Sequence, residues 1–253
     1  MELSKITDAV NGGAVLREYL CSVSDEGYRA FQAALVPGAG GSIIGVRVPE
    51  LRRIAKEISK ADAAAYLACP CGDTFEERVI YGLVLASKKC GAEELKADIL
   101  KYAGMVTNWA ENDIVSFKGI KKYREEIKGM IDTLLFGGGP WQTRYGLKIL
   151  MDYYIDDEYI DYTLEKTAAV KSGEYYVYMM QGWLLATAAV SYGEKVIGLL
   201  NAGTDALTKQ AICAAADKMR DSRRISKEDK DRVQMIKRAI KGPGKGGKDN
   251  AEK

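Results

Sequence analysis

The segment PELRRIAKEI, residues 49–58, shows the pattern that decides the fold. Its apolar side chains recur at positions 51, 54, 55 and 58, and this spacing places them on one face of an α-helix. Proline suits the start of such a helix, because the first N–H groups have no intrahelical partner. Charged side chains occupy the other face. The segment is therefore predicted to form an amphipathic helix.

The same helical spacing recurs along most of the chain. Thr74 followed by Glu77 predicts a capping box, and the helix that it opens is expected to end at Cys90-Gly91. Glycines mark most of the later breaks, at positions 119, 137–139, 173, 193 and 203. At least ten helices are expected, with the later ones at residues 93–106, 108–119, 123–136, 140–155, 157–171, 174–192, 194–201, 204–221 and 226–241.

Three tryptophans give the spacing of the helix pairs. Trp109, Trp141 and Trp183 lie in different predicted helices and are 32 and then 42 residues apart, about one helix pair per step. This spacing favours an all-α fold, an α-α superhelix (solenoid) of HEAT- or armadillo-like helix pairs. A single repeat domain is expected over residues 1–241. Residues 242–253, which are rich in Gly and Lys, are expected to form a flexible basic tail.

Composition excludes several classes of protein. The chain has no histidine, so Ser-His-Asp and Cys-His nucleophile systems are excluded. Its five cysteines are expected to be buried thiols, and only Cys69 and Cys71 lie close together, which leaves a zinc site without enough ligands. No apolar run approaches the roughly 18 residues of a spanning helix, and the N-terminus lacks the apolar region of a secretory signal. A cytoplasmic protein without metal or cofactor, monomeric by default, is expected.

The charge is unevenly distributed. From Lys209 onward the chain has fourteen Lys or Arg against seven Asp or Glu, so the preceding part is net acidic although the whole chain is +2. A basic C-terminal part suggests a polyanionic partner such as nucleic acid, but it also fits a solvated surface. The charge alone leaves both interpretations open.

Two short segments combine tryptophan with a charged residue. Trp109 and Asp113 are four residues apart and share a helix face, so they could face a ligand together. Alternatively, Trp109 is core and Asp113 is solvated or caps the helix. Arg144 follows Trp141 near a helix start, where a cation is unfavourable unless an anion accompanies it. That anion is either a ligand or an acidic side chain of the protein.

A third segment, residues 174–183, is rich in aromatic and methionine side chains. Tyr176, Met179, Met180 and Trp183 share a helical stripe, which is more typical of a core than of a binding site. Gly182 lies inside this predicted helix, where glycine costs about 1 kcal/mol relative to alanine. It therefore predicts close approach by a neighbouring helix or a ligand.

Four motifs in order resemble the DNA alkylation repair (AlkD-like) family. They are IGVRVPELRRIAK at residues 44–56, N-W-A-x-x-D at 108–113, W-x-x-R-Y-G at 141–146 and Y-Y-V-x-M-x-x-G-W at 175–183, and the resemblance spans about residues 25–235. It implies a DNA glycosylase of HEAT-like repeats that holds duplex DNA in a concave groove and removes N3- or N7-alkylated purines. It further implies that Trp109 and Trp183 flank the lesion's deoxyribose, that Asp113 is the catalytic carboxylate and that Arg144 contacts the nearby phosphate.

Duplex DNA as partner requires basic residues concentrated in one place, because the chain before Lys209 is net acidic. Tyr178 stands where members of the family are often basic, so one phosphate contact is expected to be missing. The candidate DNA-binding residues are Arg47, Arg52, Lys56, Lys118, Arg220, Arg223 and Arg224, with Arg53, Lys121 and Lys122 as further candidates.

Two other functions compete with the glycosylase. A non-catalytic HEAT-like module that binds DNA or protein is the main alternative, because a fold alone does not determine activity. The retained Trp109 and Asp113 favour the enzyme. A cofactor-dependent enzyme is not supported, because Gly137-Gly138-Gly139 lies between predicted helices with no strand before it.

Overall fold

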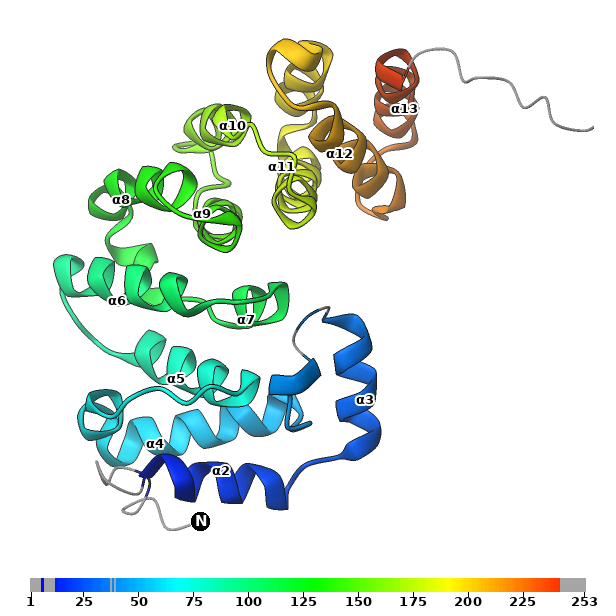
Figure 1. The fold of residues 1–253 in the computed structure, drawn as a ribbon. Coiled ribbons are helices and arrows are strands. Elements are labelled where there is room, and N and C mark those ends of the chain that lie inside the picture. Colours follow the sequence, from blue (N-terminus) through cyan, green and yellow to red (C-terminus); the bar gives the residue numbers. More distant parts are fainter. Residues whose placement is uncertain (1–5, 7–11, 37, 39, 242–253) are drawn as a thin grey trace, which may run out of the picture. The chain divides into compact units, whose positions relative to one another are not determined.

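The computed structural model describes residue 6, residues 12–36, residue 38 and residues 40–241. These residues form twelve α-helices and three short 3-10 helices, and no β-strand occurs among them (Figure 1). The predicted all-helical fold class is therefore confirmed. The predicted tail, residues 242–253, lies outside the described residues.

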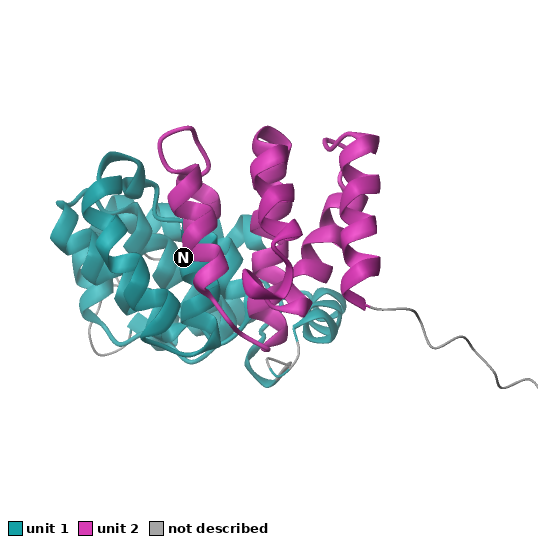
Figure 2. Ribbon diagram, turned by 90° about the horizontal axis from the view of Figure 1, so that it is seen from above, with its two compact units in different colours: residues 1–149 teal, residues 150–253 magenta. Residues whose placement is uncertain are grey.

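Contacts divide the chain into two compact units, residues 1–149 and 150–253, shown in two colours in Figure 2. The single domain expected over residues 1–241 stays a prediction. The first unit contains α2 (Gly12–Ser22), α3 (Glu26–Leu35), η1 (Gly40–Ser42), α4 (Val48–Ala68), α5 (Phe75–Ser87), α6 (Ala92–Met105), α7 (Trp109–Ile114), η2 (Lys118–Lys122) and α8 (Arg124–Phe136). The division falls within α9 (Pro140–Tyr153), and the second unit continues with α10 (Ile160–Ala169), α11 (Tyr175–Asn201), η3 (Gly203–Asp205), α12 (Lys209–Asp221) and α13 (Lys227–Lys241).

Helices pack mainly on their neighbours in the sequence. In the first unit α4 packs on α5, α5 on α6 and α6 on α8. In the second unit α11 packs on α10, α12 and α13. Trp109, Trp141 and Trp183 lie in α7, α9 and α11, so the predicted step of one helix pair is confirmed. Neighbour-on-neighbour packing of this kind is that of helical repeat proteins.

The predicted capping box at Thr74 is present. The Glu77 N–H donates to Thr74 Oγ1 over 3.3 Å, and the Thr74 N–H donates to Glu77 Oε2 over 3.0 Å. Arg17 of α2 donates to the same Glu77 carboxylate, so the cap also ties α2 to α5. The helix ends at Ser87, slightly before the expected stop at Cys90-Gly91.

The break predicted between helices at 174–192 and 194–201 is present. The element α11 joins two helices across a kink at Tyr192, where φ is −127° and ψ is 42°. Ala188 and Ala189 before the bend and Val196 and Ile197 after it are all buried. Both helices therefore bury an apolar face, one on each side of the kink.

Close approach at Gly182 is confirmed. A Cβ atom at this position would lie 2.7 Å from both the carbonyl carbon and the Cβ of Ala214 in α12. By length and composition α11 is also apolar enough to cross a membrane, a test that the core helix of a soluble protein also passes. Its packing on α10, α12 and α13 accounts for the apolar sequence.

The cysteines differ from expectation. Cys21 is exposed, and Cys69, Cys71, Cys90 and Cys213 are half-buried rather than buried. Burial is still sufficient at Cys71 to raise the pKa of its thiol to about 12. Cys71 and Cys90 lie between helices and Cys213 lies within α12, and none of the five is fully buried.

Candidate functional site

The short helix α7 carries two of the predicted site residues, Trp109 and Asp113. Asn108 caps this helix, because its side-chain Oδ1 accepts hydrogen bonds from the N–H groups of Ala110 and Glu111, both at 3.0 Å. The Asn108 cap and the buried apolar residue Ala110 fix the helix at its first turn. The sequence N-W-A therefore encodes a helix start that presents the tryptophan in the first turn.

A buried ion pair fixes the position of α7 within the first unit. Glu111 is fully buried, and its Oε1 lies 2.7 Å from Nη2 of Arg78 in α5. The other carboxylate oxygen accepts the N–H of Thr107 at 2.8 Å. Tyr102 of α6 donates its hydroxyl to the Glu111 backbone carbonyl, also at 2.8 Å. Neighbouring helices therefore hold α7 on two sides.

The prediction of one helix over 108–119 is wrong, because α7 ends at Ile114. The next residues turn their side chains into the core, and both Val115 and Phe117 are buried. The Val115 carbonyl accepts a hydrogen bond from the Tyr145 hydroxyl at 3.1 Å, which replaces the helical partner that it lacks. This early stop leaves Asp113 in the last turn of α7.

Asp113 is bound by Arg144. Arg144 Nη2 lies 2.7 Å from Asp113 Oδ2 and 3.0 Å from Oδ1, and Nε lies 3.3 Å from Oδ1. Only 7% of the arginine side chain and 18% of the aspartate side chain are exposed. Arg144 comes from α9, and Asn112 of α7 also donates to the Trp141 carbonyl of α9 at 2.9 Å. The anion expected beside Arg144 is therefore present, and it is the candidate catalytic carboxylate.

Trp109 is half-buried, which differs from the core position that was one of its two interpretations. Its indole N–H donates to the Leu35 carbonyl at the end of α3 over 3.1 Å. Leu35 and Phe31 of α3 have exposed side chains. The hydrogen bond orients the tryptophan ring while part of the ring stays accessible.

Trp183 belongs to the second unit, where 39% of it is exposed. Of the predicted aromatic and methionine stripe only Met180 is buried, while Tyr176 and Met179 are half-buried. The core interpretation of this stripe is therefore wrong for three of its four members. The exposed rings continue at Tyr175, which packs edge-on against Tyr176 and Tyr178 at centroid distances of 5.0 and 5.5 Å. That Trp183 acts with Trp109 stays a prediction.

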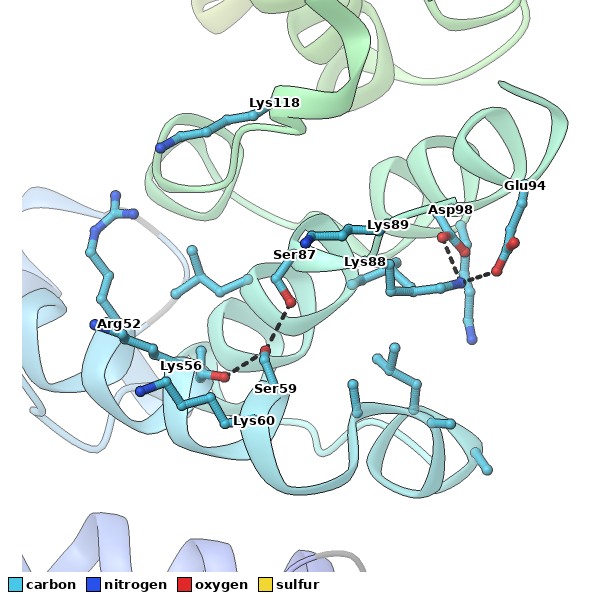
Figure 3. Close-up of a pocket in the computed structure, with 18 residues that line it drawn as sticks. Arg52, Lys56, Ser59, Lys60, Ser87, Lys88, Lys89, Glu94, Asp98 and Lys118 are labelled. Atoms are coloured by element: carbon cyan, nitrogen blue, oxygen red, sulfur yellow. Dashed lines mark hydrogen bonds and ion pairs between the residues drawn. The ribbon is translucent and has the colours of Figure 1, made fainter. Parts of the chain in front are cut away.

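A cleft of about 1040 Å³ in the first unit gathers three of the predicted DNA-binding residues (Figure 3). We call it the basic cleft. Helices α4, α5 and α6 and the first residue of η2 line it, and two acidic residues, Glu94 and Asp98, take part. Its cationic residues are Arg52, Lys56, Lys60, Lys88, Lys89, Lys101 and Lys118.

The other candidate cations of the first unit do not line the basic cleft. Arg47 stacks on the Tyr28 ring, with 4.7 Å from its guanidinium carbon to the ring centroid, and pairs with Asp25. Arg53 pairs with Glu50 and Glu57. Lys122 lines an adjoining hollow of about 760 Å³ that shares Lys88, Lys89 and Lys118 with the cleft, and Lys121 is exposed nearby in η2.

The three arginines predicted in the second unit are all exposed. Arg220 pairs with Asp217 and Asp221, each at 2.9 Å, so two carboxylates accompany the charge. Arg223 and Arg224 lie in the turn between α12 and α13 and make no ion pair within the described part of the chain. Their role in binding DNA stays a prediction.

Comparison with known proteins tests the resemblance drawn from the motifs. The sequence model of a family described as DNA alkylation repair enzyme matches residues 16–219. The chain belongs to the DNA alkylation repair family. The search of curated proteins and the search of solved structures found no match. Family membership gives this protein a role in DNA repair, with DNA as its partner.

The matched region of this DNA alkylation repair protein contains Trp109, Asp113, Arg144 and Trp183 as well as the basic cleft. It ends immediately before Arg220 and excludes α13. The predicted site in the first unit and the predicted tryptophan in the second unit thus lie in the part that defines the family, whereas the C-terminal arginines do not.

Sequence reasoning missed two groups of residues in this DNA alkylation repair protein. Arg78 and Glu111 support α7, but a lone arginine and a lone glutamate 33 residues apart give no local signal. Lys60 lines the basic cleft from α4 and Lys89 lines it from the connection between α5 and α6, so no local run of charge predicts them together. Arg52 and Lys56, which are four residues apart and share a helix face, were the sequence signal that pointed to the cleft.

Proposed function

We propose that this protein is a DNA glycosylase that hydrolyses the N-glycosidic bond of cationic N3- or N7-alkylated purines in duplex DNA. The observation that carries the proposal is the Asp113 carboxylate. Arg144 holds this carboxylate, and the half-buried Trp109 lies on the same short helix as Asp113. Membership of the DNA alkylation repair family supports the choice of substrate class.

The proposed chemistry uses the positive charge of the damaged base. When the N-glycosidic bond breaks, the electron pair goes to the purine, which leaves as a neutral base, so no general acid is needed. The chain has no histidine to act as one. The sugar becomes an oxocarbenium ion, water adds at C1′, and the added water loses its proton to solvent.

In this proposal Asp113 stabilises the sugar cation electrostatically. A carboxylate that is fixed before the reaction does not have to reorganise as positive charge develops on the sugar. Electrostatic stabilisation of the transition state is largest in such a preorganised site. Arg144 fixes it through charge-assisted hydrogen bonds to both carboxylate oxygens. The accessible face of Trp109 adds a cation–π contribution of about 1 kcal/mol or more. Trp183 would supply a second aromatic face.

The deciding experiment measures release of 7-methylguanine and 3-methyladenine from methylated duplex DNA by the purified protein. Asp113→Asn is expected to lower the single-turnover rate by roughly 100-fold or more, because a fixed charge aimed at the transition state is lost. Asp161→Asn is the matched control, since that aspartate pairs with Lys195 on the surface of α10. Its rate is expected to equal that of the wild type.

The alternative function is a non-catalytic helical module that binds DNA or protein. It would be assigned if wild-type protein and Asp113→Asn release equally little base while both bind the duplex. Equal release by both variants at a high rate would instead remove Asp113 from the mechanism.

A further inference from the structure

The basic cleft takes no part in the cleavage step proposed above. It lies in the first unit, and Figure 3 shows cations that line it: Arg52, Lys56 and Lys60 on α4, Lys89 between α5 and α6, and Lys118 on η2. Three of these cations were candidates from the sequence. Lys60 and Lys89 have been assigned no role so far.

The cleft concentrates positive charge in an acidic part of the chain. Seven cationic side chains line it against two carboxylates, and a single lysine, Lys88, binds both carboxylates, at 2.6 Å from Glu94 and 2.8 Å from Asp98. Lys56, Lys60, Lys89 and Lys118 make no ion pair within the described residues. Like charges gathered this closely repel one another unless an external anion lies among them.

The lining also shows how such an anion would be recognised. No aromatic side chain is among the residues that line the basic cleft, and its uncharged lining consists of alanine, leucine and serine. Ser59 and Ser87 are hydrogen-bonded to each other at 2.8 Å, and Ser59 also donates to the Ala55 carbonyl at 2.7 Å. A nucleobase would find no ring to stack on. The cleft therefore suits phosphate groups recognised by charge, without base contacts.

One edge of the cleft reaches the candidate catalytic helix. Arg52 Nη2 donates to the Ile114 carbonyl at 3.1 Å, and Ile114 directly follows Asp113. At the other side the cleft adjoins the hollow that contains Lys122. A chain of phosphates in the cleft would thus continue to the helix that carries Asp113.

We propose that the basic cleft binds the phosphodiester backbone of one DNA strand, with Lys60 and Lys89 acting together with Arg52 and Lys56. The choice of DNA as the polyanion rests on the proposed function. Binding here is independent of sequence and of damage, because only the backbone is contacted. The cleft holds the strand while α7 meets the lesion.

The test uses undamaged duplex DNA, so that it does not depend on catalysis. Dissociation constants are measured by fluorescence anisotropy over a range of salt concentrations for wild-type protein and for the double variant Lys60→Ala/Lys89→Ala. Each lost lysine–phosphate contact is expected to lower the slope of log affinity against log salt by about 1, so the double variant should lose about 2.

The matched control is Lys96→Ala/Lys128→Ala, which removes the same net charge from the same unit. These lysines pair with Glu93 and Glu125 on α6 and α8 and do not line the cleft. The control is expected to keep the wild-type slope. An equal loss of slope in both double variants would show a general charge effect and overturn the proposal.

Failure of this proposal can be distinguished from failure of the proposed function. A protein that releases alkylated purines but whose slope is unchanged in Lys60→Ala/Lys89→Ala is a glycosylase that does not use the cleft. A protein that releases no alkylated purine, but whose salt slope falls by about 2 in Lys60→Ala/Lys89→Ala, binds the DNA backbone in the basic cleft without catalysis. Inorganic tripolyphosphate that binds wild type but not the double variant, with DNA binding unchanged in both, would assign the cleft to a free polyphosphate and overturn the proposal.

Discussion

Arg144 Nη2 contacts both carboxylate oxygens of Asp113, at 2.7 and 3.0 Å, and joins α9 to the last turn of α7. The arginine side chain is almost entirely buried. A planar guanidinium that grips a carboxylate in this way fixes its direction as well as its charge. This contact differs from the phosphate contact that the family resemblance implied for Arg144, and the two roles predict different effects of substitution.

Arg144→Lys keeps the positive charge but cannot reproduce the two-oxygen grip. If Arg144 positions Asp113, the single-turnover rate of base release is expected to fall by about 10- to 100-fold, since small misplacements of a reacting group are costly. The salt slope for binding undamaged duplex should stay at the wild-type value. Thermal unfolding followed by circular dichroism checks that the variant is folded.

The opposite pattern would contradict this positioning role. A salt slope lowered by about 1 in Arg144→Ala, with an unchanged rate at saturating protein, would show that Arg144 contacts a phosphate.

Glu111→Gln removes the charge that holds α7 against α5. Because Glu111 is fully buried and pairs with Arg78 at 2.7 Å, the variant leaves an arginine with little compensation. The free energy of unfolding is expected to fall by about 3 kcal/mol. Urea unfolding measures it, and Glu125→Gln, which breaks an exposed pair with Lys128, should cost less than about 1 kcal/mol. Equal losses in the two variants would show that the buried pair does not stabilise α7.

Gly182→Ala is expected to destabilise the second unit by about 1 to 3 kcal/mol, because the added methyl group overlaps the backbone of α12 at Ala214. Gly198→Ala in the same helix is the control. A Cβ there meets nothing within 4 Å, so the higher helix propensity of alanine should raise stability by up to about 1 kcal/mol. Thermal unfolding compares the two variants, and a stabilised Gly182→Ala would disprove the close approach.

Stability is expected to fall in acid partly through Glu77. Burial raises the pKa of this carboxyl group, but hydrogen bonds from Arg17 and Thr74 outweigh burial and lower its pKa below the ordinary value of 4.5. A lowered folded-state pKa stabilises the protein above pH 4.5, and the contribution is lost as the pH falls through the folded-state pKa.

Urea unfolding from about pH 6 to about pH 3 tests this dependence. Glu77→Gln should be less stable than wild type at the upper end and should show a shallower loss toward the lower end. Glu93→Gln, at an exposed position on α6, should follow the wild-type curve. Parallel curves for wild type and Glu77→Gln would remove Glu77 from the acid response.

Local sequence determined the helical character of this protein. The apolar spacing after Pro49 and the Thr74–Glu77 capping box depend on contacts within one or two helical turns, so they could be predicted without the fold. The resemblance to the DNA alkylation repair family likewise came from four short motifs, and the family match confirmed it. Helix ends were less predictable, because α7 ends at Ile114 instead of residue 119, and Val115 and Phe117 turn into the core.

Tertiary structure alone decided which charges meet. The Asp113–Arg144 pair joins residues 31 apart, and the ion pair of Glu111 joins residues 33 apart. The basic cleft gathers lysines from α4, from α6, from the connection between α5 and α6, and from a 3-10 helix, although the surrounding sequence is net acidic. Charge–charge contacts of this kind depend on how helices pack, and helix packing is not encoded in the spacing of any one segment. The sequence thus determined the helices and the candidate residues, and packing decided their partners.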